Sequence, residues 1–343
     1  MHRLRDLRFL YQALKMRFLT HRPIFLSHMI TSICNCKCAF CHYWRLGKRQ
    51  EMSTGQILDM LKDARDIGFT DYIVWGGEPL LRPDLPRILS YANRLGLDNT
   101  LITNGSLLSD RVEEIGEDLY GLIVSLDYPK PELHDDLRGH KGIFDKAIKG
   151  IEKAKNFSHI NIFINCVIHK GNSNHLRDMA ELAQNLGVKL TYEMMERVEG
   201  YNEHLGLTPK EVTDIALELL ELKSEGYPIG NSSGYFKALA GHAKYQCHVP
   251  KVLVTVEWNG RIRICSTIAE DNKPDLAEYD LGNITRNTFK EIFASRGYLK
   301  YIEAAEKCHK CDLSYPREIA LIYSLNAEAI LNFFSKITEI SKK

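Results

Sequence analysis

Short β-branched or apolar runs alternate with longer segments of helical period from Ile24 to about Glu193. This alternation constrains the fold most, because it is typical of βα units in which each helix returns the chain to the next parallel strand. We count six such units. The predicted strands span Ile24–Ile33, Asp71–Trp75, Asn99–Thr103, Gly121–Leu126, Asn161–Ile168 and Lys189–Glu193. The helices between them include Ser53–Ile67, Asp84–Leu95, Ile143–Asn156 and Asn174–Leu186.

Three cysteines directly follow the first predicted strand. Cys34, Cys38 and Cys41 have the spacing C-x3-C-x2-C, at the end of the strand where parallel βα barrels place their active sites. Three thiolates can hold one iron-sulfur cluster and leave its fourth iron open to a ligand. The alternative is a zinc site or an electron-transfer cluster, either of which would favour four ligands close together. Cys36 is left over as a bystander or an alternative ligand, and we favour a bystander.

This spacing, with Phe40 just before the last cysteine, resembles the signature of the radical S-adenosylmethionine (radical SAM) superfamily. The resemblance implies an α/β fold, a partial (β/α)6 TIM barrel. It also implies that the open iron of a 4Fe-4S cluster binds SAM, and that one electron then cleaves SAM to a 5'-deoxyadenosyl radical, which takes hydrogen from a substrate. The segment Trp75-Gly76-Gly77-Glu78-Pro79 resembles the GGEP motif of the superfamily, which contacts the SAM ammonium group.

Polar residues at the ends of the later strands continue this pattern. Arg138 matches an arginine that pairs with the SAM carboxylate in relatives, and a forked guanidinium suits that contact. Each residue alone could equally be a strand-end cap or part of a surface ion pair, but together they favour ligand binding. The residues that the resemblance assigns to SAM are Phe40, Gly76, Gly77, Glu78, Pro79, Thr103, Asn104, Ser125, Asp127, Arg138 and Asn165.

A second set of four cysteines lies near the C-terminus, at Cys247, Cys265, Cys308 and Cys311. Before and after Asn259-Gly260, a dipeptide that favours tight turns, Val252–Glu257 and Arg261–Cys265 are predicted to form a hairpin. The arrangement resembles the SPASM and shorter twitch domains of radical SAM enzymes, which implies a small C-terminal domain holding one auxiliary 4Fe-4S cluster. Structural zinc is the alternative, since four thiolates suit tetrahedral Zn²⁺ equally well.

Four segments follow from these patterns: a basic amphipathic helix over residues 1–22, the barrel over 23–225, the auxiliary-cluster domain over 226–316 and a C-terminal helix over 317–343. The first helix can lie on an anionic membrane surface or pack against the barrel, and the sequence leaves both open. With 45 basic and 44 acidic residues, the net charge of +1 predicts no nucleic-acid partner. No secretory signal or membrane span is found, so we expect a cytoplasmic protein with membrane association as an option.

Two substrate classes are candidates. A basic arm followed by Arg22-Pro23 loosely resembles the hopanoid-modifying branch of radical SAM enzymes, which implies a lipid or isoprenoid-like substrate. Peptide modification is the second candidate, although peptide-modifying relatives often carry a leader-binding domain and only 33 residues precede Cys34. A two-cluster redox sensor or electron carrier is the non-enzymatic alternative, but such a protein needs no SAM pocket. Radical SAM chemistry implies an external electron donor such as a flavodoxin or ferredoxin.

Overall fold

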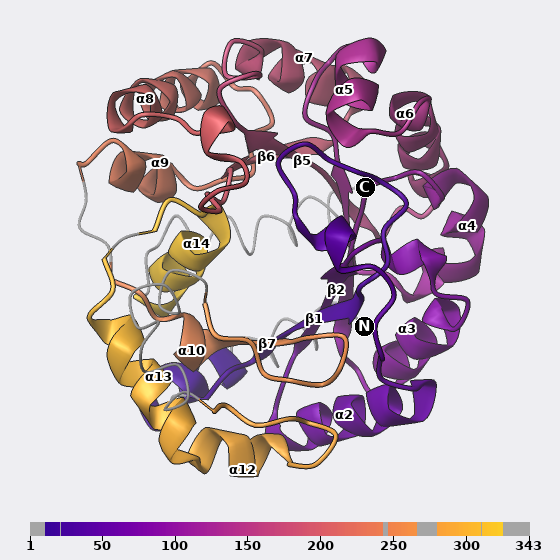
Figure 1. The fold of residues 1–343 in the computed structure, drawn as a ribbon, viewed down its shortest axis with the longest axis vertical. Coiled ribbons are helices and arrows are strands. Elements are labelled where there is room, and N and C mark those ends of the chain that lie inside the picture. The colour runs from indigo at the N-terminus through magenta and orange to yellow at the C-terminus, as the bar shows by residue number, and fades with distance from the viewer. Residues whose placement is uncertain (1–10, 21, 243–245, 266–279, 310, 325–343) are drawn as a thin grey trace.

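Seven parallel strands form one sheet at the centre of the computed structural model (Figure 1). The structure describes residues 11–20, 22–242, 246–265, 280–309 and 311–324. The strands follow the order β6-β5-β4-β3-β2-β1-β7, and each neighbouring pair is parallel. They are β1 Phe25–Thr31, β2 Asp71–Gly76, β3 Asp98–Thr103, β4 Gly121–Ser125, β5 Asn161–Ile168, β6 Lys189–Met194 and β7 Leu253–Val256.

Helices form a ring outside this sheet (Figure 1), as expected when each helix carries the chain back to the start of the next strand. The first seven are α2 Thr54–Ile67, α3 Leu85–Arg94, α4 Leu108–Ile115, α5 Pro131–Arg138, α6 Ile143–Ala154, α7 Leu176–Leu186 and α8 Pro209–Ser224. The later helices are α9 Ser233–Leu239, α10 Val249–Val252, α12 Phe289–Ala294, α13 Arg296–Glu306 and α14 Ser314–Tyr323, and they fill the sector between α8 and α2. The α/β partial barrel with a C-terminal extension is therefore confirmed.

The six predicted strands are confirmed, and the predicted hairpin is present, but its first strand has a second partner. β7 pairs parallel with β1, with Phe25 opposite Leu253 and His28 opposite Val256. On its other side β7 forms the predicted hairpin, through the antiparallel bridge between Val256 and Ile262 and a hydrogen bond from the Arg263 N–H to the Thr255 carbonyl at 2.9 Å. β7 therefore has main-chain partners on both of its edges, where the sequence indicated one. A strand from the segment predicted for the second domain thus belongs to the barrel sheet.

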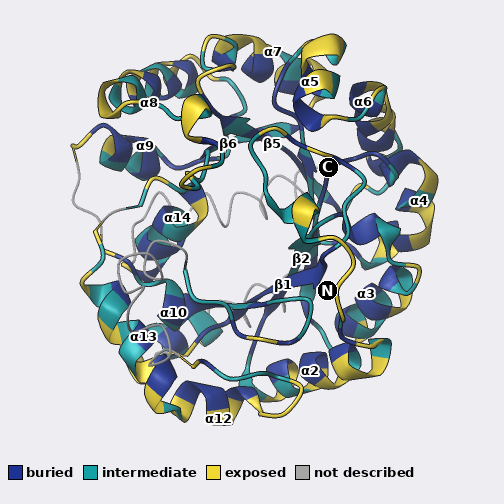
Figure 2. Ribbon diagram, in the orientation of Figure 1, coloured by how far each residue is buried: buried dark blue, intermediate teal, exposed yellow. Residues whose placement is uncertain are grey.

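Burial follows the layers of the fold. Every residue of β1 is buried, and the outer faces of the ring helices carry most of the exposed residues (Figure 2). The helix α8 begins at the predicted Thr208, whose hydroxyl accepts a hydrogen bond from the Glu211 N–H in a capping box. The apolar core between sheet and helices holds the strand ends in place, and these ends form the candidate site.

The described part of the N-terminal helix is α-helical over residues 11–15 and continues as a π-helical turn, η1, over Met16–Thr20. Met16 is buried in an apolar cluster with Phe25, Leu253 and Tyr323, so this helix does pack against the fold. Of the predicted C-terminal helix, α14 is described and residues 325–343 lie outside the described part. Within the described residues, none of the helices is both long and apolar enough to span a bilayer.

Candidate metal centres and the cavity between them

The first three cysteines lie in one loop that follows β1 at its carboxyl end. The Lys37 N–H donates to the carbonyl of Arg138 at 2.9 Å, which fixes the loop against the end of α5. Within the loop, the Cys41 N–H donates to the carbonyl of Cys38 at 3.2 Å. Cys34, Cys38 and Cys41 are therefore held in one short, hydrogen-bonded turn.

Cys36 shares the buried cluster that contains Cys38 and Ile143, with Cys34 and Cys41 packed against it. Its main-chain N–H donates to the Cys34 sulfur at 3.4 Å. Hydrogen bonding from Cys36 lowers the pKa of Cys34 to about 6, whereas burial raises the pKa of Cys38 to about 11. Cys34 is therefore the more readily ionised of these two thiols, and Cys36 lies beside it.

The two glycines of the GGEP segment allow the end of β2 to press against the cysteine loop. A Cβ added to Gly77 would lie 2.0 Å from the Ile33 carbonyl oxygen, and one added to Gly76 would lie 2.6 Å from that of Thr31. Because glycine has no Cβ, the two segments come close enough for the Gly77 N–H to donate to the Thr31 carbonyl at 2.9 Å. The glycines thus let the main chain at the end of β2 lie directly against the start of the cysteine loop. The sequence had suggested that they let the main chain approach a ligand.

Glu78 is completely buried, and donors of this chain satisfy its carboxylate. The oxygens accept from the Leu80 N–H at 3.0 Å, the Thr103 hydroxyl at 2.7 Å and the Asn104 N–H at 2.8 Å. Burial raises the pKa of Glu78 to about 7 despite these donors. The Asn104 side chain in turn donates to the Cys34 sulfur at 3.9 Å. Glu78 therefore connects the ends of β2 and β3 with the cysteine loop.

Asp127 and Arg138 form a buried ion pair beside the same loop. The Arg138 Nε donates to the Asp127 carboxylate at 2.7 Å, and the other carboxylate oxygen accepts from the Val167 N–H at 2.9 Å. The Arg138 Nη1 donates to the Cys38 sulfur at 3.7 Å, and its guanidinium carbon lies 5.4 Å from the ring centre of Phe40. Burial acts to lower the pKa of Arg138, but Asp127 and Cys38 outweigh it and the pKa is raised. The cation is thus held permanently at the cysteine loop.

The remaining predicted residues complete the same edge of the sheet. Ser125 lies opposite Asn165 in the pairing of β4 with β5, and the Asn165 side-chain oxygen accepts from the Thr191 hydroxyl at 2.9 Å. Pro79 is buried and opens the short helix η3, Pro79–Leu81. All predicted residues of the first set therefore gather at the carboxyl ends of β1 to β5.

The four later cysteines come together from three segments on the wall of one cavity inside the barrel, of about 350 Å³: they are Cys247, Cys265, Cys308 and Cys311. The Cys247 N–H donates to the carbonyl of Cys308 at 3.3 Å, and the Cys265 N–H donates to the Tyr301 hydroxyl at 3.1 Å. Among the described residues, no three Cys, His, Asp or Glu side chains are arranged around a position for a single metal ion. A four-iron cluster sets its thiolates farther apart than one zinc ion does.

Two family models match the chain along these two sites. The model described as the radical SAM superfamily matches residues 29–183. The model described as SPASM, an iron-sulfur cluster-binding domain, matches residues 247–312. The chain is a radical SAM enzyme. Its cofactors are a 4Fe-4S cluster with SAM and a SPASM auxiliary cluster, and it needs a reductant and a substrate. The non-enzymatic electron carrier is thereby discarded.

Individual relatives of this radical SAM enzyme act in several kinds of chemistry. It is 25% identical over 308 residues to the AdoMet-dependent heme synthase of Oleidesulfovibrio alaskensis, a match that covers 82% of this chain and 78% of that protein. A second AdoMet-dependent heme synthase, from Methanosarcina barkeri, and the probable GTP 3',8-cyclases of Saccharolobus islandicus are matched over about half of their own length.

Two solved structures share the fold. SuiB of Streptococcus suis bound to S-adenosylmethionine superposes with a TM-score of 0.68 at 17% identity, covering 85% of this chain and 70% of that one. The structure of anSMEcpe with bound AdoMet gives a TM-score of 0.65 at 21% identity, covering 94% and 98%. At these identities the likeness concerns the fold alone.

The first site of this radical SAM enzyme fits the cluster that its family implies. Three thiols lie in one loop, and N–H donors from Asn104 and Arg138 reach the sulfurs of Cys34 and Cys38. Such donors stabilise thiolate ligands and tune the metal they hold. A three-thiol set leaves one iron of a four-iron cluster without a protein ligand.

The loop after β6 contributes residues that the sequence did not reveal. The Tyr201 hydroxyl donates to the carbonyl of Cys41 at 2.9 Å, and the Asn202 side chain donates to that of Phe40 at 2.9 Å. These bonds hold the far end of the cysteine loop. Tyr201 and Cys41 are 160 residues apart in the sequence, so no local sequence pattern could have predicted their contact.

A second unforeseen pair links the two metal sites. Tyr43 lies two residues after Cys41, and Arg263 lies two residues before Cys265. The guanidinium carbon of Arg263 is 5.3 Å from the ring centre of Tyr43. Burial raises the pKa of Tyr43 to about 12, so the phenol stays neutral. Both residues line the cavity whose wall also contains the four later cysteines.

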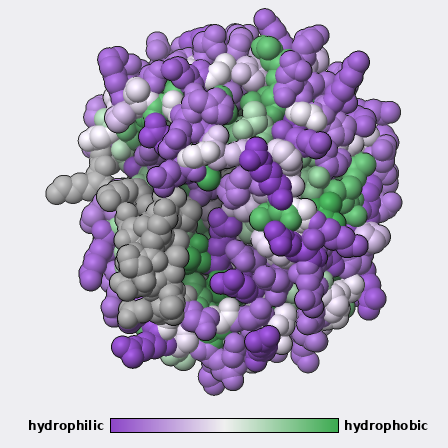
Figure 3. All heavy atoms as spheres, viewed as in Figure 1, coloured by the Kyte–Doolittle hydropathy of each residue, from purple (hydrophilic) through white to green (hydrophobic). Residues whose placement is uncertain are grey.

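The wall of this cavity, which we call the interior cavity, is mainly apolar and aromatic. It includes Ile73, Trp75, Ile102, Tyr301 and Tyr315, and its charged residues are Glu193, Glu196 and Arg263. Figure 3 shows that the face above the barrel is largely polar, with apolar atoms visible in its central hollow. The interior cavity therefore offers an apolar chamber beneath a polar surface.

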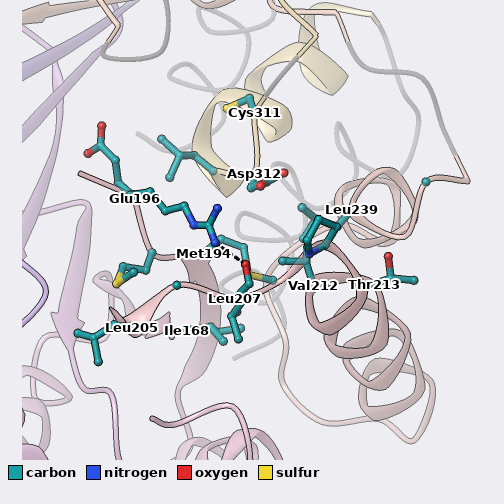
Figure 4. Close-up of a pocket in the computed structure, with 16 residues that line it drawn as sticks. Ile168, Met194, Glu196, Leu205, Leu207, Val212, Thr213, Leu239, Cys311 and Asp312 are labelled. Carbon is teal, nitrogen blue, oxygen red and sulfur yellow. Dashed lines mark hydrogen bonds between the residues drawn. The ribbon is translucent and has the colours of Figure 1, made fainter. Parts of the chain in front are cut away.

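A second cavity of about 480 Å³ lies beside it, between the end of β6 and the helices α8 and α9 (Figure 4). Glu196, Cys311 and Leu313 line both cavities. In Figure 4, Val212 of α8 and Leu239 of α9 face this space. The two cavities therefore adjoin on the side of the barrel between β6 and the C-terminal segment.

Proposed function

We propose that Cys34, Cys38 and Cys41 hold the SAM-binding cluster, and that the auxiliary cluster is held by Cys247, Cys265, Cys308 and Cys311. When bound, the first cluster and SAM supply a 5'-deoxyadenosyl radical that abstracts hydrogen from the substrate. The span of the SPASM match, residues 247–312, includes all four later cysteines and supports the second assignment. The shared loop and its N–H donors support the first.

The other predicted residues divide into two tasks. Asp127 keeps the guanidinium of Arg138 beside Cys38, where its charge favours the thiolate form of a ligand. Glu78 already accepts three hydrogen bonds from this chain, so we assign it to positioning the cysteine loop and the GGEP edge. Gly76 and Gly77, by the same reasoning, set the distance between β2 and the cysteine loop.

We further propose that the substrate is an elongated, mainly apolar molecule, lipid or isoprenoid-like. The observation that carries this proposal is the interior cavity, whose wall is made chiefly of aliphatic and aromatic side chains and includes the four later cysteines and Tyr43, two residues after Cys41. Burying apolar surface in such a chamber favours binding by about 25 cal/mol per Å² removed from water. The relatives reported above include none from the hopanoid-modifying branch, so the proposal rests on the cavity.

Peptide modification is the second candidate, and the adjoining cavity favours it. Glu196, Arg197 and Asp312 place charged groups around a space that is open beside the barrel, and peptide main chains and polar side chains need such partners. A flavodoxin or ferredoxin is the proposed electron donor for either substrate, since the radical reaction consumes one electron for each SAM cleaved.

The formation of 5'-deoxyadenosine by reduced enzyme under anaerobic conditions tests the substrate class. We expect an isoprenoid alcohol such as farnesol to stimulate it above the substrate-free rate, and short peptides to leave it unchanged. Ile102→Trp, which fills part of the interior cavity, should remove the stimulation and keep the substrate-free rate. Ile102→Val is the matched control and should retain both. Stimulation by peptides alone would replace the first candidate with the second.

A further inference from the structure

Exposed apolar side chains concentrate on the N-terminal helix. Among the described residues, eight large apolar side chains are exposed, and four of them lie within residues 11–19. These four are Tyr11, Leu14, Phe18 and Leu19, with exposed fractions of 61%, 43%, 58% and 77%. Positions 11, 14 and 18 recur at helical spacing, so they form one stripe along the helix. We call these four residues the outer stripe.

The opposite side of the same helix is fixed to the fold. Met16 is 2% exposed and is buried with Phe25, Leu253 and Tyr323, while Ala13 packs against that cluster. The guanidinium carbon of Arg17 lies 4.9 Å from the ring centre of Tyr323. The helix therefore cannot turn its outer stripe inward without breaking this packing.

Positive charge accompanies the outer stripe. Between positions 11 and 22 the sequence carries Lys15, Arg17 and Arg22 and no acid, whereas the whole chain has a net charge of +1. The ammonium group of Lys15 lies 5.9 Å from the ring centre of Tyr11, so one cation sits directly beside the stripe. Apolar side chains with adjacent cations match an anionic lipid surface, where the chains enter the headgroup region and the cations remain at it.

We propose that the helix of residues 11–20 docks this enzyme on an anionic membrane by inserting the outer stripe among the lipid headgroups. The position of the helix also brings the interior cavity close to the docked membrane. Ile73, Val249 and Leu253 line the interior cavity and also contact the cluster around Met16. The docking helix therefore lies beneath the floor of that cavity. If the substrate is apolar, which rests on the proposed function, this places the chamber next to the membrane that dissolves it.

Vesicle sedimentation with the cluster-loaded enzyme tests the docking without any turnover. Wild type should bind vesicles of phosphatidylcholine mixed with phosphatidylglycerol, and bind vesicles of phosphatidylcholine alone more weakly. Replacing Phe18 and Leu19 together by glutamate should weaken binding to the mixed vesicles about tenfold or more. High salt should weaken binding of wild type, because exposed charges are screened.

The matched control replaces Leu217 and Leu299 by glutamate, since both are exposed leucines on other helices. This control should bind as wild type does, and both double variants should keep the substrate-free formation of 5'-deoxyadenosine. Absence of binding by wild type, or an equal loss in the control, would overturn the proposal. So would a dimer of wild type that Phe18→Glu and Leu19→Glu dissociate, because the stripe would then be a protein interface. Binding that begins only after deletion of residues 325–343 would show that the chain itself covers the stripe.

Discussion

The two cysteine sites of this enzyme use the chain in opposite ways. The first set lies within eight residues, from Cys34 to Cys41, and the second set is spread over the 65 residues from Cys247 to Cys311. Proximity along the chain brings the first set together, and hydrogen bonds to neighbouring segments then hold its loop. The second set comes together only in the folded chain, from the segment before α10, the segment after β7 and the segment after α13. A local site therefore tolerates changes elsewhere in the chain, whereas a dispersed site depends on the fold around it.

The largest expected effects are losses of iron and of SAM cleavage, and together they distinguish the two cysteine sites. Replacing Cys34, Cys38 and Cys41 by alanine should remove about four of about eight irons per chain and abolish 5'-deoxyadenosine formation. Replacing Cys308 and Cys311 by serine should also remove about four irons, but substrate-free SAM cleavage should persist. Iron analysis of anaerobically reconstituted protein and chromatography of deoxyadenosine measure both outcomes.

Cys36→Ala is the control for the first site and should keep the full iron content. An equal loss from that single change would mean that Cys36 is a ligand and that the assignment of the first set is wrong. For the second site, one zinc and four irons in protein isolated without oxygen would contradict the auxiliary cluster as assigned to these four cysteines. Either result would show at which of the two sites the cysteine spacing predicts the wrong ligands or the wrong metal.

A smaller effect should come from the glycine edge that orients the first site. In Gly77→Ala the new Cβ would meet the Ile33 carbonyl oxygen at 2.0 Å, so the cysteine loop must move away from β2. We expect the free energy of unfolding to fall by about 1–3 kcal/mol and the first cluster to load less completely. Denaturant unfolding and iron content measure the two effects.

The control on the same chain is Gly55→Ala in α2. Its new Cβ would have only the Ser53 hydroxyl within reach, at 3.9 Å, and alanine favours a helix over glycine by up to about 1 kcal/mol. This variant should therefore be unchanged or slightly more stable. If Gly77→Ala behaves in the same way, β2 does not set the position of the cysteine loop.

The same contrast explains what could be predicted from the sequence. Six strands followed from alternating runs, and the first cysteine set followed from its spacing, because both are local patterns. The pairing of β7 with β1 did not, since a tight-turn dipeptide such as Asn259-Gly260 predicts a hairpin whatever sheet edge lies nearby. Tyr201 and Asn202 were also missed, because contacts between distant loops leave no periodic signal.

The hydrogen-bond partners of the site residues were harder to predict than the positions of these residues. Glu78 and Arg138 were expected to face SAM, and they do lie at the expected edge. Yet the Glu78 carboxylate already accepts hydrogen bonds from Leu80, Thr103 and Asn104. The Arg138 Nε already donates to the Asp127 carboxylate. A motif places a side chain at the end of a strand, but only the packed structure shows how many of its hydrogen bonds are already made.

The smallest expected effect compares one glutamate with a raised pKa at each site. Glu193 of β6 accepts from the Ser314 N–H at 2.6 Å, as Glu78 does from its neighbours. Burial raises the pKa of both from 4.5 to about 7. Between these values the folded chain keeps protons that the unfolded chain has lost, so the free energy of unfolding should fall as the pH rises. Each group contributes a slope of at most about 1.4 kcal/mol per pH unit.

Glu78→Gln and Glu193→Gln should each flatten that fall, because a glutamine cannot titrate. Denaturant unfolding without oxygen, at several pH values between about 4.5 and 7, gives the slope for wild type and both variants. Since Glu193 holds the segment after Cys311 and Glu78 holds the cysteine loop, Glu193→Gln should weaken retention of auxiliary iron and Glu78→Gln that of the first cluster. Parallel pH curves for all three proteins would contradict the raised pKa values, and equal iron loss in both variants would contradict the division between the sites.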